Sequence, residues 1–246
     1  MASQPSTPAV HLQGLVKNYG ETSVLRGIDV EIPAGQIAVL LGSNGAGKTT
    51  LLRILSMLTQ PDAGTVQIYG FDTATNGPSV RAVTGAALHS PMLYSDMSIR
   101  ENLEFFAGLY RLDSVSNLIE KTSNKVGISE RLDQRVRTLS HGYQKRVALA
   151  RSLMHNPSLL ILDEPDSGLD SLSVGMLDTI INEHRASGKT VLFTTHLLDH
   201  ALEIADRAVV LDRGRVLIDS TNPESERDAI LDAYARQQSL SGAANA

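Results

Sequence analysis

Four short, continuously apolar runs, separated by stretches of helical periodicity, constrain the fold of this 246-residue chain most strongly. A strand that is apolar on both faces is buried on both faces, which is typical of parallel strands covered by helices on each side. The pattern therefore predicts an α/β fold around a parallel sheet. The runs are QIAVLL (36–41), SLLILD (158–163), TVLFTT (190–195) and AVVLD (208–212).

A looser alternation of apolar and polar residues near the N-terminus predicts a second sheet. It occurs in VHLQGLVKNYG, VLRGIDVEIP and TVQIYG, and it is typical of antiparallel strands with one face on the core. Residues 98 to about 155 instead have helical periodicity alone, so we expect a helical insertion within the α/β core. The helices expected along the chain are 47–58, 98–111, 116–126, 142–155, 173–186, 197–206 and 224–237.

Composition and charge narrow the class of partner. The net charge of -5 argues against sequence-wide electrostatic binding to nucleic acid, so none is expected as a partner. No apolar run approaches the roughly eighteen residues of a membrane span. The opening MASQPSTPAV lacks the basic and apolar regions of a secretory signal, and the absence of cysteine excludes disulfides and thiolate metal sites. We therefore expect a cytoplasmic protein whose partners are small molecules or other proteins.

The first apolar run leads directly into GSNGAGKTT (42–50), and a helical pattern follows it. A strand, the motif G-x-x-x-x-G-K-[ST] and a helix in this order predict a P-loop, whose backbone N–H groups surround the phosphates of a nucleoside triphosphate. Lys48 is expected to contact the β- and γ-phosphates, and Thr49 to offer its hydroxyl to Mg²⁺. The residues expected to bind ATP here are Gly42, Ser43, Asn44, Gly45, Ala46, Gly47, Lys48, Thr49 and Thr50.

Two further apolar runs end in chemically active side chains. LLILDEP ends in two carboxylates; beside a P-loop strand, Asp163 is the expected Mg²⁺ ligand and Glu164 the group that orients and polarises the attacking water. TVLFTTH ends in His196, where an imidazole can sense the γ-phosphate. The alternative for this histidine is a metal site with His200, but the pair lacks the intervening glutamate of H-E-x-x-H.

The stretch LSHGYQKR (139–146) places Ser140, a good N-cap, directly before a helical run. The N-terminus of that helix offers unpaired N–H groups and the positive end of a dipole, so it can receive an anion. Taken alone, the turn is most simply a helix cap. The phosphates expected at the P-loop are an anion that this helix N-terminus could bind, which favours anion binding over a cap alone.

Taken in chain order, KNYG, GSNGAGKT, LSHGYQKR, LLILDEP, SGLD and TTH resemble the nucleotide-binding subunit of an ATP-binding-cassette (ABC) transporter. The resemblance implies the P-loop NTPase fold of ABC ATPases: a mixed sheet core, a flanking antiparallel β subdomain and an inserted helical subdomain. The implied division is a flexible N-terminal arm (1–9), an ABC ATPase domain (10–220) with a RecA-like core at about 10–90 and 156–220 and a helical subdomain at about 91–155, and a C-terminal helix with a disordered tail (221–246).

In that family two ATPase subunits dimerise head to tail, and the resemblance assigns further roles accordingly. Ser140 and the backbone at Gly142 would close over ATP held by the P-loop of the second copy, which excludes water and neutralises charge from both sides. Tyr19 is similar to the aromatic residue that stacks on adenine, Asp170 to the carboxylate at the dimer seam, and His196 to the switch histidine. The resemblance thus implies hydrolysis of ATP with Mg²⁺, a homodimer, and a separate integral membrane transporter subunit.

Two sites depart from the family pattern. His89 stands where the family usually has glutamine; it is a candidate catalytic residue, because a ring nitrogen can donate or accept a hydrogen bond, but its side chain is shorter than glutamine and titratable. His141 and Tyr143 stand where the signature commonly has glycine and glutamine. The stretch LHSPMLYSDMSIRENLEFFAGLYRL is similar to haem-exporter ATPase subunits of cytochrome c maturation, which suggests haem export for cytochrome c biogenesis.

Two classes of function are consistent with these motifs. The first is an ATPase on the inner face of the cell membrane that docks to its membrane subunit beside HSPMLY (89–94), with haem, or a substrate of the drug or lipid type, as the cargo. The second is a soluble ABC ATPase acting on DNA or ribosomes. Those relatives carry long insertions or tandem cassettes, and this acidic sequence has no basic stripe. A nucleotide kinase on a P-loop fold would leave LSHGYQKR and TTH unexplained.

Overall fold

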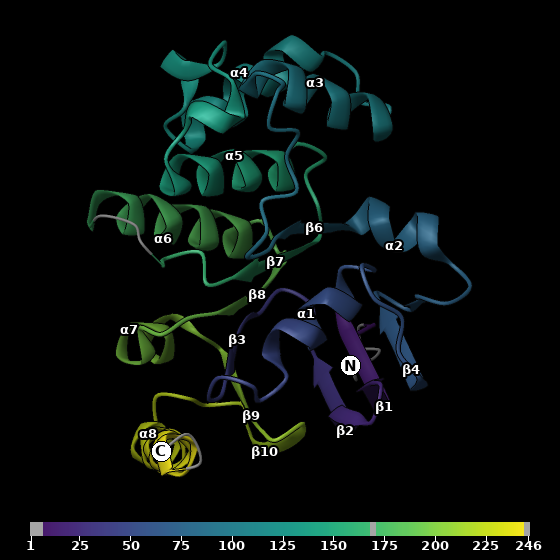
Figure 1. Cartoon of the computed structure of the whole chain (residues 1–246), viewed down its shortest axis with the longest axis vertical. Helices are drawn as coiled ribbons and strands as arrows, with labels where there is room; N and C mark the ends of the chain where they lie inside the picture. The colour runs from purple at the N-terminus through teal and green to yellow at the C-terminus, as the bar shows by residue number, and fades with distance from the viewer. Residues whose placement is uncertain (1–6, 168–170, 244–246) are drawn as a thin grey trace, which may run out of the picture.

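The four apolar runs form neighbouring strands of one six-stranded sheet in the computed structural model, which describes residues 7–167 and 171–243 (Figure 1). The prediction of a parallel sheet is confirmed, because β3 pairs in parallel with β8 and β9, and β7 with β8. Two strands extend the edges, β6 in parallel and β10 antiparallel, which gives the order β10-β9-β3-β8-β7-β6. The bounds are β3 (Ile37–Leu41), β6 (Thr84–Ala87), β7 (Leu159–Asp163), β8 (Thr190–Thr194), β9 (Arg207–Asp212) and β10 (Arg215–Ser220).

The predicted second sheet is also present. It is antiparallel, with the order β2-β1-β4-β5, and is made of β1 (Val10–Tyr19), β2 (Thr22–Ile32), β4 (Ala63–Ile68) and β5 (Phe71–Asp72). The predicted flexible arm of residues 1–9 overlaps this sheet at its last residue. Ala9 is buried, and its N–H donates to the Ile32 carbonyl at 2.8 Å, because a buried N–H requires a partner. Residues 1–6 of the predicted arm lie outside the described residues.

Between β6 and β7 the chain is helical, as predicted. α3 (Ile99–Leu109), α4 (Val115–Lys125) and α5 (His141–Leu153) lie together at one end of the molecule (Figure 1), and two short 3-10 turns lie between α4 and α5. α3 begins with a capping box, in which the Ser98 hydroxyl accepts from the Glu101 N–H and the Glu101 carboxylate accepts from the Ser98 N–H. The other helices near the sheet are α1 (Lys48–Leu55), α6 (Ser171–Ala186) and α7 (Leu198–Ile204).

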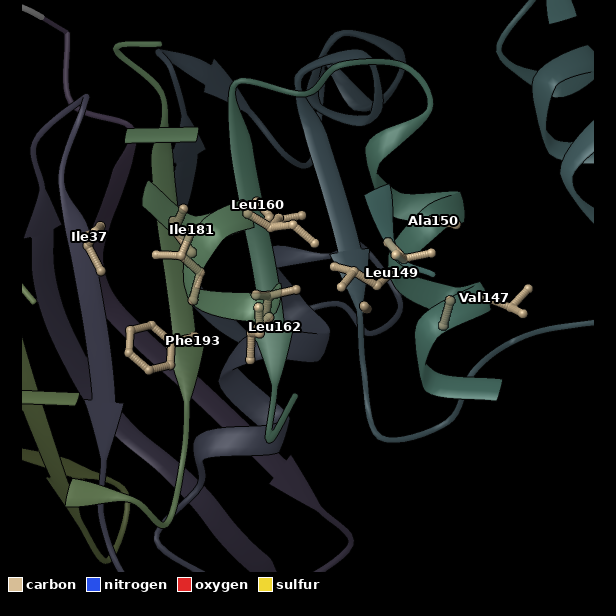
Figure 2. Close-up of a cluster of buried hydrophobic side chains, with 14 of the residues drawn as sticks. Ile37, Val147, Leu149, Ala150, Leu160, Leu162, Ile181 and Phe193 are labelled. Carbon is tan, nitrogen blue, oxygen red and sulfur yellow. The ribbon is translucent and has the colours of Figure 1, made fainter. Parts of the chain in front are cut away.

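Both faces of the parallel sheet are buried, which explains the continuously apolar runs. Along β3, Ile37, Val39 and Leu41 belong to one core cluster, while Ala38 and Leu40 belong to the other. Figure 2 shows the first cluster, in which side chains of β3, β7 and β8 lie with residues of α5 and α6. Because successive side chains of a strand point to opposite faces, a strand in this position must be apolar at every residue.

The structure differs from the predicted elements in several places. α2 (Gly77–Val83) and the strands β5, β6 and β10 have no predicted counterpart, and the first helix ends at Leu55 rather than at residue 58. The C-terminal helix α8 spans Arg227–Ala243. The predicted end of this helix at residue 237 is therefore wrong, and residues 240–243, predicted to be disordered, belong to the helix. Residues 244–246 lie outside the described part. Over the described ranges, no helix combines the length and apolarity required to cross a membrane.

Candidate functional site

Three neighbouring strands of the central sheet deliver the candidate site residues to one edge. β3 leads into the P-loop, β7 ends at Asp163, and β8 ends at Thr194, which is the register partner of Asp163. Since these strands are parallel, their carboxyl ends lie at the same edge of the sheet. The sheet therefore brings the P-loop, the two carboxylates and the TTH segment together, although they come from distant parts of the sequence.

The P-loop has room for glycine alone at two of its turns. Gly42 has a φ of 146°, and a Cβ there would lie 2.4 Å from the Leu211 carbonyl oxygen. Gly47 has a φ of 107°, and its Cβ would lie 2.7 Å from Leu25 Cδ2. Both conformations are unfavourable for residues with a Cβ, so the motif glycines permit the turn and the close approach of β2 and β9.

Lys48, the first residue of α1, is buried beneath this loop with 7% of its surface exposed. Its Nζ donates to the Gly42 carbonyl at 2.6 Å and to the Ser43 carbonyl at 3.2 Å. Burial lowers the pKa of Lys48, and the nearby carboxylates of Glu164 and Asp163 oppose that shift. The site therefore holds a partly desolvated amine beside two carboxylates, where the phosphates of a nucleotide would add negative charge.

Thr194 organises the two carboxylate residues, and the sequence interpretation did not single it out. Its Oγ1 donates to Asp163 Oδ1 at 2.8 Å and accepts from the Glu164 N–H at 2.9 Å. On its other side, Asp163 Oδ2 accepts from Thr49 Oγ1 at 3.4 Å. The expected pair of Mg²⁺ ligands, Thr49 and Asp163, is thus brought together. The only sequence signal for Thr194 was its place in TTH, one strand across from Asp163.

His196 and Glu164 form a contact, with 2.9 Å between Nε2 and Oε1. Glu164 has a φ of 47°, a conformation that is uncommon for a residue with a side chain and occurs most often at functional sites. His200 instead contacts Asp178, with 2.8 Å between Nε2 and Oδ1. The two histidines of the alternative metal site therefore face different carboxylates.

His89 lies near the Mg²⁺-binding residues proposed from the sequence. It is exposed and lines a cavity of about 280 Å³ together with Thr49 and Asp163. Its ring centroid is 6.4 Å from that of His141, which is also exposed. Two of the three residues that depart from the family pattern, His89 and His141, are therefore neighbours within one chain.

The signature segment has the predicted cap. The Ser140 hydroxyl accepts from the Tyr143 N–H at 3.4 Å, while Ser140 itself is exposed at the start of α5. Further along α5, Lys145 Nζ donates to the Glu164 carbonyl at 3.0 Å and to the Ser167 carbonyl at 2.8 Å. Burial lowers the pKa of Lys145, against the effect of the nearby carboxylates, Glu164 first. This lysine ties the signature helix to the segment after β7, and no sequence pattern indicated it.

The remaining predicted residues are Tyr19, the other P-loop residues and Asp170. Tyr19 is 48% exposed at the end of β1, and Lys17 Nζ lies 5.4 Å from its ring centroid. Within the P-loop, Asn44 and Gly45 are exposed and Ala46 is buried. Thr50 is half-buried in the first turn of α1. Asp170, predicted at the dimer seam, lies outside the described residues.

Comparison with known proteins gives a consistent family. Residues 25–167 match the sequence model described as ABC transporter. A Nod factor export ATP-binding protein I from Ralstonia nicotianae is 38% identical over 85% of this chain and 66% of that protein. The daunorubicin/doxorubicin resistance ATP-binding protein DrrA of Streptomyces peucetius is 35% identical over 91% of this chain and 68% of that protein.

A solved structure supports the same family. The ATP-binding cassette MJ0796, a dimer in a post-hydrolysis state bound to ADP and Pi, superposes with a TM-score of 0.79. It is 25% identical and covers 87% of this chain and 98% of its own. Because the family model spans more than half of the sequence and the site motifs meet at one sheet edge, the chain belongs to the ABC transporter family, as a nucleotide-binding ATPase subunit.

Proposed function

We propose that this chain binds MgATP at the P-loop edge of the central sheet, hydrolyses it within a dimer, and couples the cycle to a membrane subunit of an exporter. The contact between Glu164 and His196, beside Asp163 and Lys48, is the observation that carries the proposal. It supports a site in which a carboxylate is positioned to orient water next to a bound phosphate.

Magnesium fits the oxygen atoms present. Thr49 Oγ1 and Asp163 Oδ2 lie 3.4 Å apart, and both are the hard oxygen ligands that Mg²⁺ prefers. The described residues contain no group of three or more histidine or carboxylate side chains arranged for a metal, and Mg²⁺ in such sites takes its other ligands from phosphates and water. When bound, the ion would neutralise charge on the β- and γ-phosphates.

The protein's contribution to hydrolysis follows from its own contacts. Glu164 orients and polarises the attacking water and accepts its proton; the water oxygen bonds to the γ-phosphorus as the bond to the bridging oxygen breaks, ADP leaves, and the proton passes to the released phosphate. Two neighbours fix Glu164. The Thr194 hydroxyl accepts a hydrogen bond from its backbone N–H, and His196 Nε2 contacts its carboxylate oxygen Oε1. His196 is then placed to respond to the presence of the γ-phosphate. His89 borders the same cavity as Thr49, so it lies within reach of the water and ion side of the site.

The site becomes closed when a second copy covers it. Ser140 is exposed at the start of α5, and Gly142 lies in the same turn, so their hydroxyl and N–H groups are available to a γ-phosphate held by another chain. Tyr19, half exposed in the β1–β2 hairpin, is proposed to stack on adenine. Asp170 is proposed for the dimer seam. Closure would exclude water and complete charge neutralisation around ATP.

His141→Ala is expected to leave ATP hydrolysis within about twofold of wild type, because exposed substitutions change free energies by about 0.5 kcal/mol or less. The His141 ring is exposed, and Ser140 and Gly142 remain in place. Steady-state phosphate release measures the rate, with Ser140→Ala as the comparison that removes the proposed γ-phosphate contact. A loss of about tenfold or more in His141→Ala would mean that this ring makes a contact with the nucleotide or its partner.

The predicted docking face has a matching groove. A cavity of about 470 Å³ lies between the end of α1, α2, α3 and the HSPMLY segment, and its wall includes Met92, Tyr94 and Phe106. Tyr94 is 50% exposed and packs edge-on against Phe105. Exposed apolar surface of this kind marks interaction sites. We propose that a cytoplasmic segment of the membrane subunit occupies the groove, which would place the chain peripherally on the inner face of the membrane.

Purification from detergent-solubilised membranes of the native cell, followed by mass spectrometry, tests this coupling. We expect a polytopic membrane protein to accompany the wild type and Leu217→Ser, and to be lost from Tyr94→Ser. Leu217, 51% exposed on β10, is the matched control. Recovery of ribosomal or DNA-associated proteins in place of a membrane protein would favour the soluble alternative.

The transported substrate is proposed from two kinds of observation. The relatives described above are named for Nod factor export and daunorubicin/doxorubicin resistance, and we propose an exporter of the drug or lipid type on that likeness, although an aliphatic sulfonates import ATP-binding protein of Rhizobium johnstonii is also 37% identical over 90% of this chain. Haem export for cytochrome c biogenesis stays a prediction that rests on His89 and the surrounding stretch. The identity of the co-purified membrane protein distinguishes the two.

A further inference from the structure

The C-terminal helix α8 contacts the P-loop and the helix α7, which follows the switch histidine. At its N-terminal end, Arg227 forms ion pairs with Asp199 and Glu203 of α7, the helix that begins two residues after His196. Ile230, one turn further on, is fully buried in the core. Figure 1 shows α8 beside α7 at the end of the molecule opposite the helical insertion. One end of α8 is therefore anchored to the helix that follows the switch histidine.

The other contact is made by Gln237, which reaches the P-loop. Its Oε1 accepts from the Ser43 N–H at 3.1 Å. Both residues are buried, with 4% of Gln237 and 6% of Ser43 exposed. A buried hydrogen bond of this kind is costly to break, because the N–H left behind has lost its contact with water.

The same peptide group is held from its opposite side by Lys48. In a trans peptide the C=O and the N–H point in opposite directions. The Gly42 carbonyl accepts from Lys48 Nζ at 2.6 Å, so the N–H of the same peptide, that of Ser43, points away from the lysine and toward α8. Rotation of this peptide is therefore opposed by both the catalytic-site lysine and the C-terminal helix.

We infer that α8 is a positioning element for the ATP site, and that Gln237 is the positioning residue that fixes the Gly42–Ser43 peptide. With this peptide fixed, Lys48 and the P-loop N–H groups are already arranged when the nucleotide arrives, and less ordering is needed on binding. The Ser43 N–H faces Gln237, so Gln237 supports the loop without competing for the phosphates. This inference deepens the proposed function and rests on it.

The test compares two adjacent glutamines in the full-length chain. Gln237→Met keeps the length of the side chain and removes the acceptor; we expect the Kd for a fluorescent ATP analogue to rise about fivefold, as for loss of one buried hydrogen bond. Gln238→Met is the matched control, because the Gln238 amide bonds to the Tyr234 hydroxyl on the exposed side of α8. Its Kd should equal that of wild type. An unchanged or lower Kd in Gln237→Met would overturn the inference.

A double-mutant cycle separates positioning from general packing. Ser43→Pro removes the donor of the same hydrogen bond, so adding Gln237→Met to Ser43→Pro should raise the Kd no further. If the rise in Kd of the double variant is the product of the rises in the two single variants, Gln237 acts through helix packing, and the inference is overturned. If Gln237→Met unfolds in the nucleotide-free melting control, Gln237→Ala, which favours the helix, replaces it. Failure of the wild type to bind the analogue would overturn the proposed function itself.

Discussion

Lys48→Ala is expected to abolish ATP binding while the fold is retained. The ammonium group is buried against the Gly42 and Ser43 carbonyls and beside two carboxylates, so it is in place to meet the phosphates. Truncating one partner of a buried, hydrogen-bonded charge pair costs about 2–5 kcal/mol, which corresponds to a rise in Kd of about 30-fold or more. Titration with a fluorescent ATP analogue measures the Kd, and thermal melting in the absence of nucleotide measures the fold.

Lys121→Ala is the matched control, because Lys121 is an exposed lysine of α4 in the helical insertion. It should bind ATP as wild type does. Tight ATP binding by Lys48→Ala would contradict the assignment of the P-loop as the phosphate site. The nucleotide-free melting curve of Lys48→Ala should still show a folded protein, because alanine favours the helix at this first position of α1; any fall in the melting temperature measures the loss of a positive charge beside Asp163 and Glu164.

Glu164→Gln is expected to keep ATP binding and to slow hydrolysis by about 100- to 10,000-fold, the usual contribution of a general base. Glutamine has the same shape, and its backbone N–H still donates to Thr194. It carries no charge to polarise the attacking water. Single-turnover hydrolysis and ATP-analogue binding measured on the same preparation separate the two effects.

The same variant tests dimer closure. Because ATP persists in the slow enzyme, light scattering should show a dimer with MgATP and a monomer without it. Glu183→Gln, an exposed glutamate of α6 paired with Lys125, should hydrolyse ATP at the wild-type rate. Wild-type hydrolysis by Glu164→Gln would remove Glu164 from the mechanism, and the lack of an ATP-dependent dimer would contradict closure across two copies.

Local patterns predicted the central sheet and the order of the site motifs. β3 is buried on both faces, so its five residues are all apolar and the run is visible without any structure. The P-loop was equally visible, because Gly42 and Gly47 occupy positions where a Cβ would collide with neighbouring segments. In both cases the surroundings of each residue, burial in β3 and lack of space in the P-loop, restrict which residue types can occupy the position.

The edge strand β6 was missed because close packing against α5 requires small residues in it, and not the large apolar residues that mark a buried strand. A Cβ on Gly85 would lie 2.2 Å from the Ser152 carbonyl oxygen of α5, so the close approach of this helix requires small residues. The strand reads TGAA and has no apolar periodicity. The short helix α2 was missed for a related reason, since only Val80 among its residues is buried.

The sequence by itself determined the fold class, the P-loop, the carboxylates after β7 and the histidine after β8, because each depends on residues that are neighbours in the chain. The tertiary structure alone decided how these residues are held. Thr194 reaches Asp163 across adjacent parallel strands, Lys145 reaches the segment after β7 from the signature helix, and Gln237 reaches Ser43 across 194 positions. Such contacts depend on the directions in which separate elements pack, and a hydrogen bond between distant residues leaves no periodic signal in the sequence.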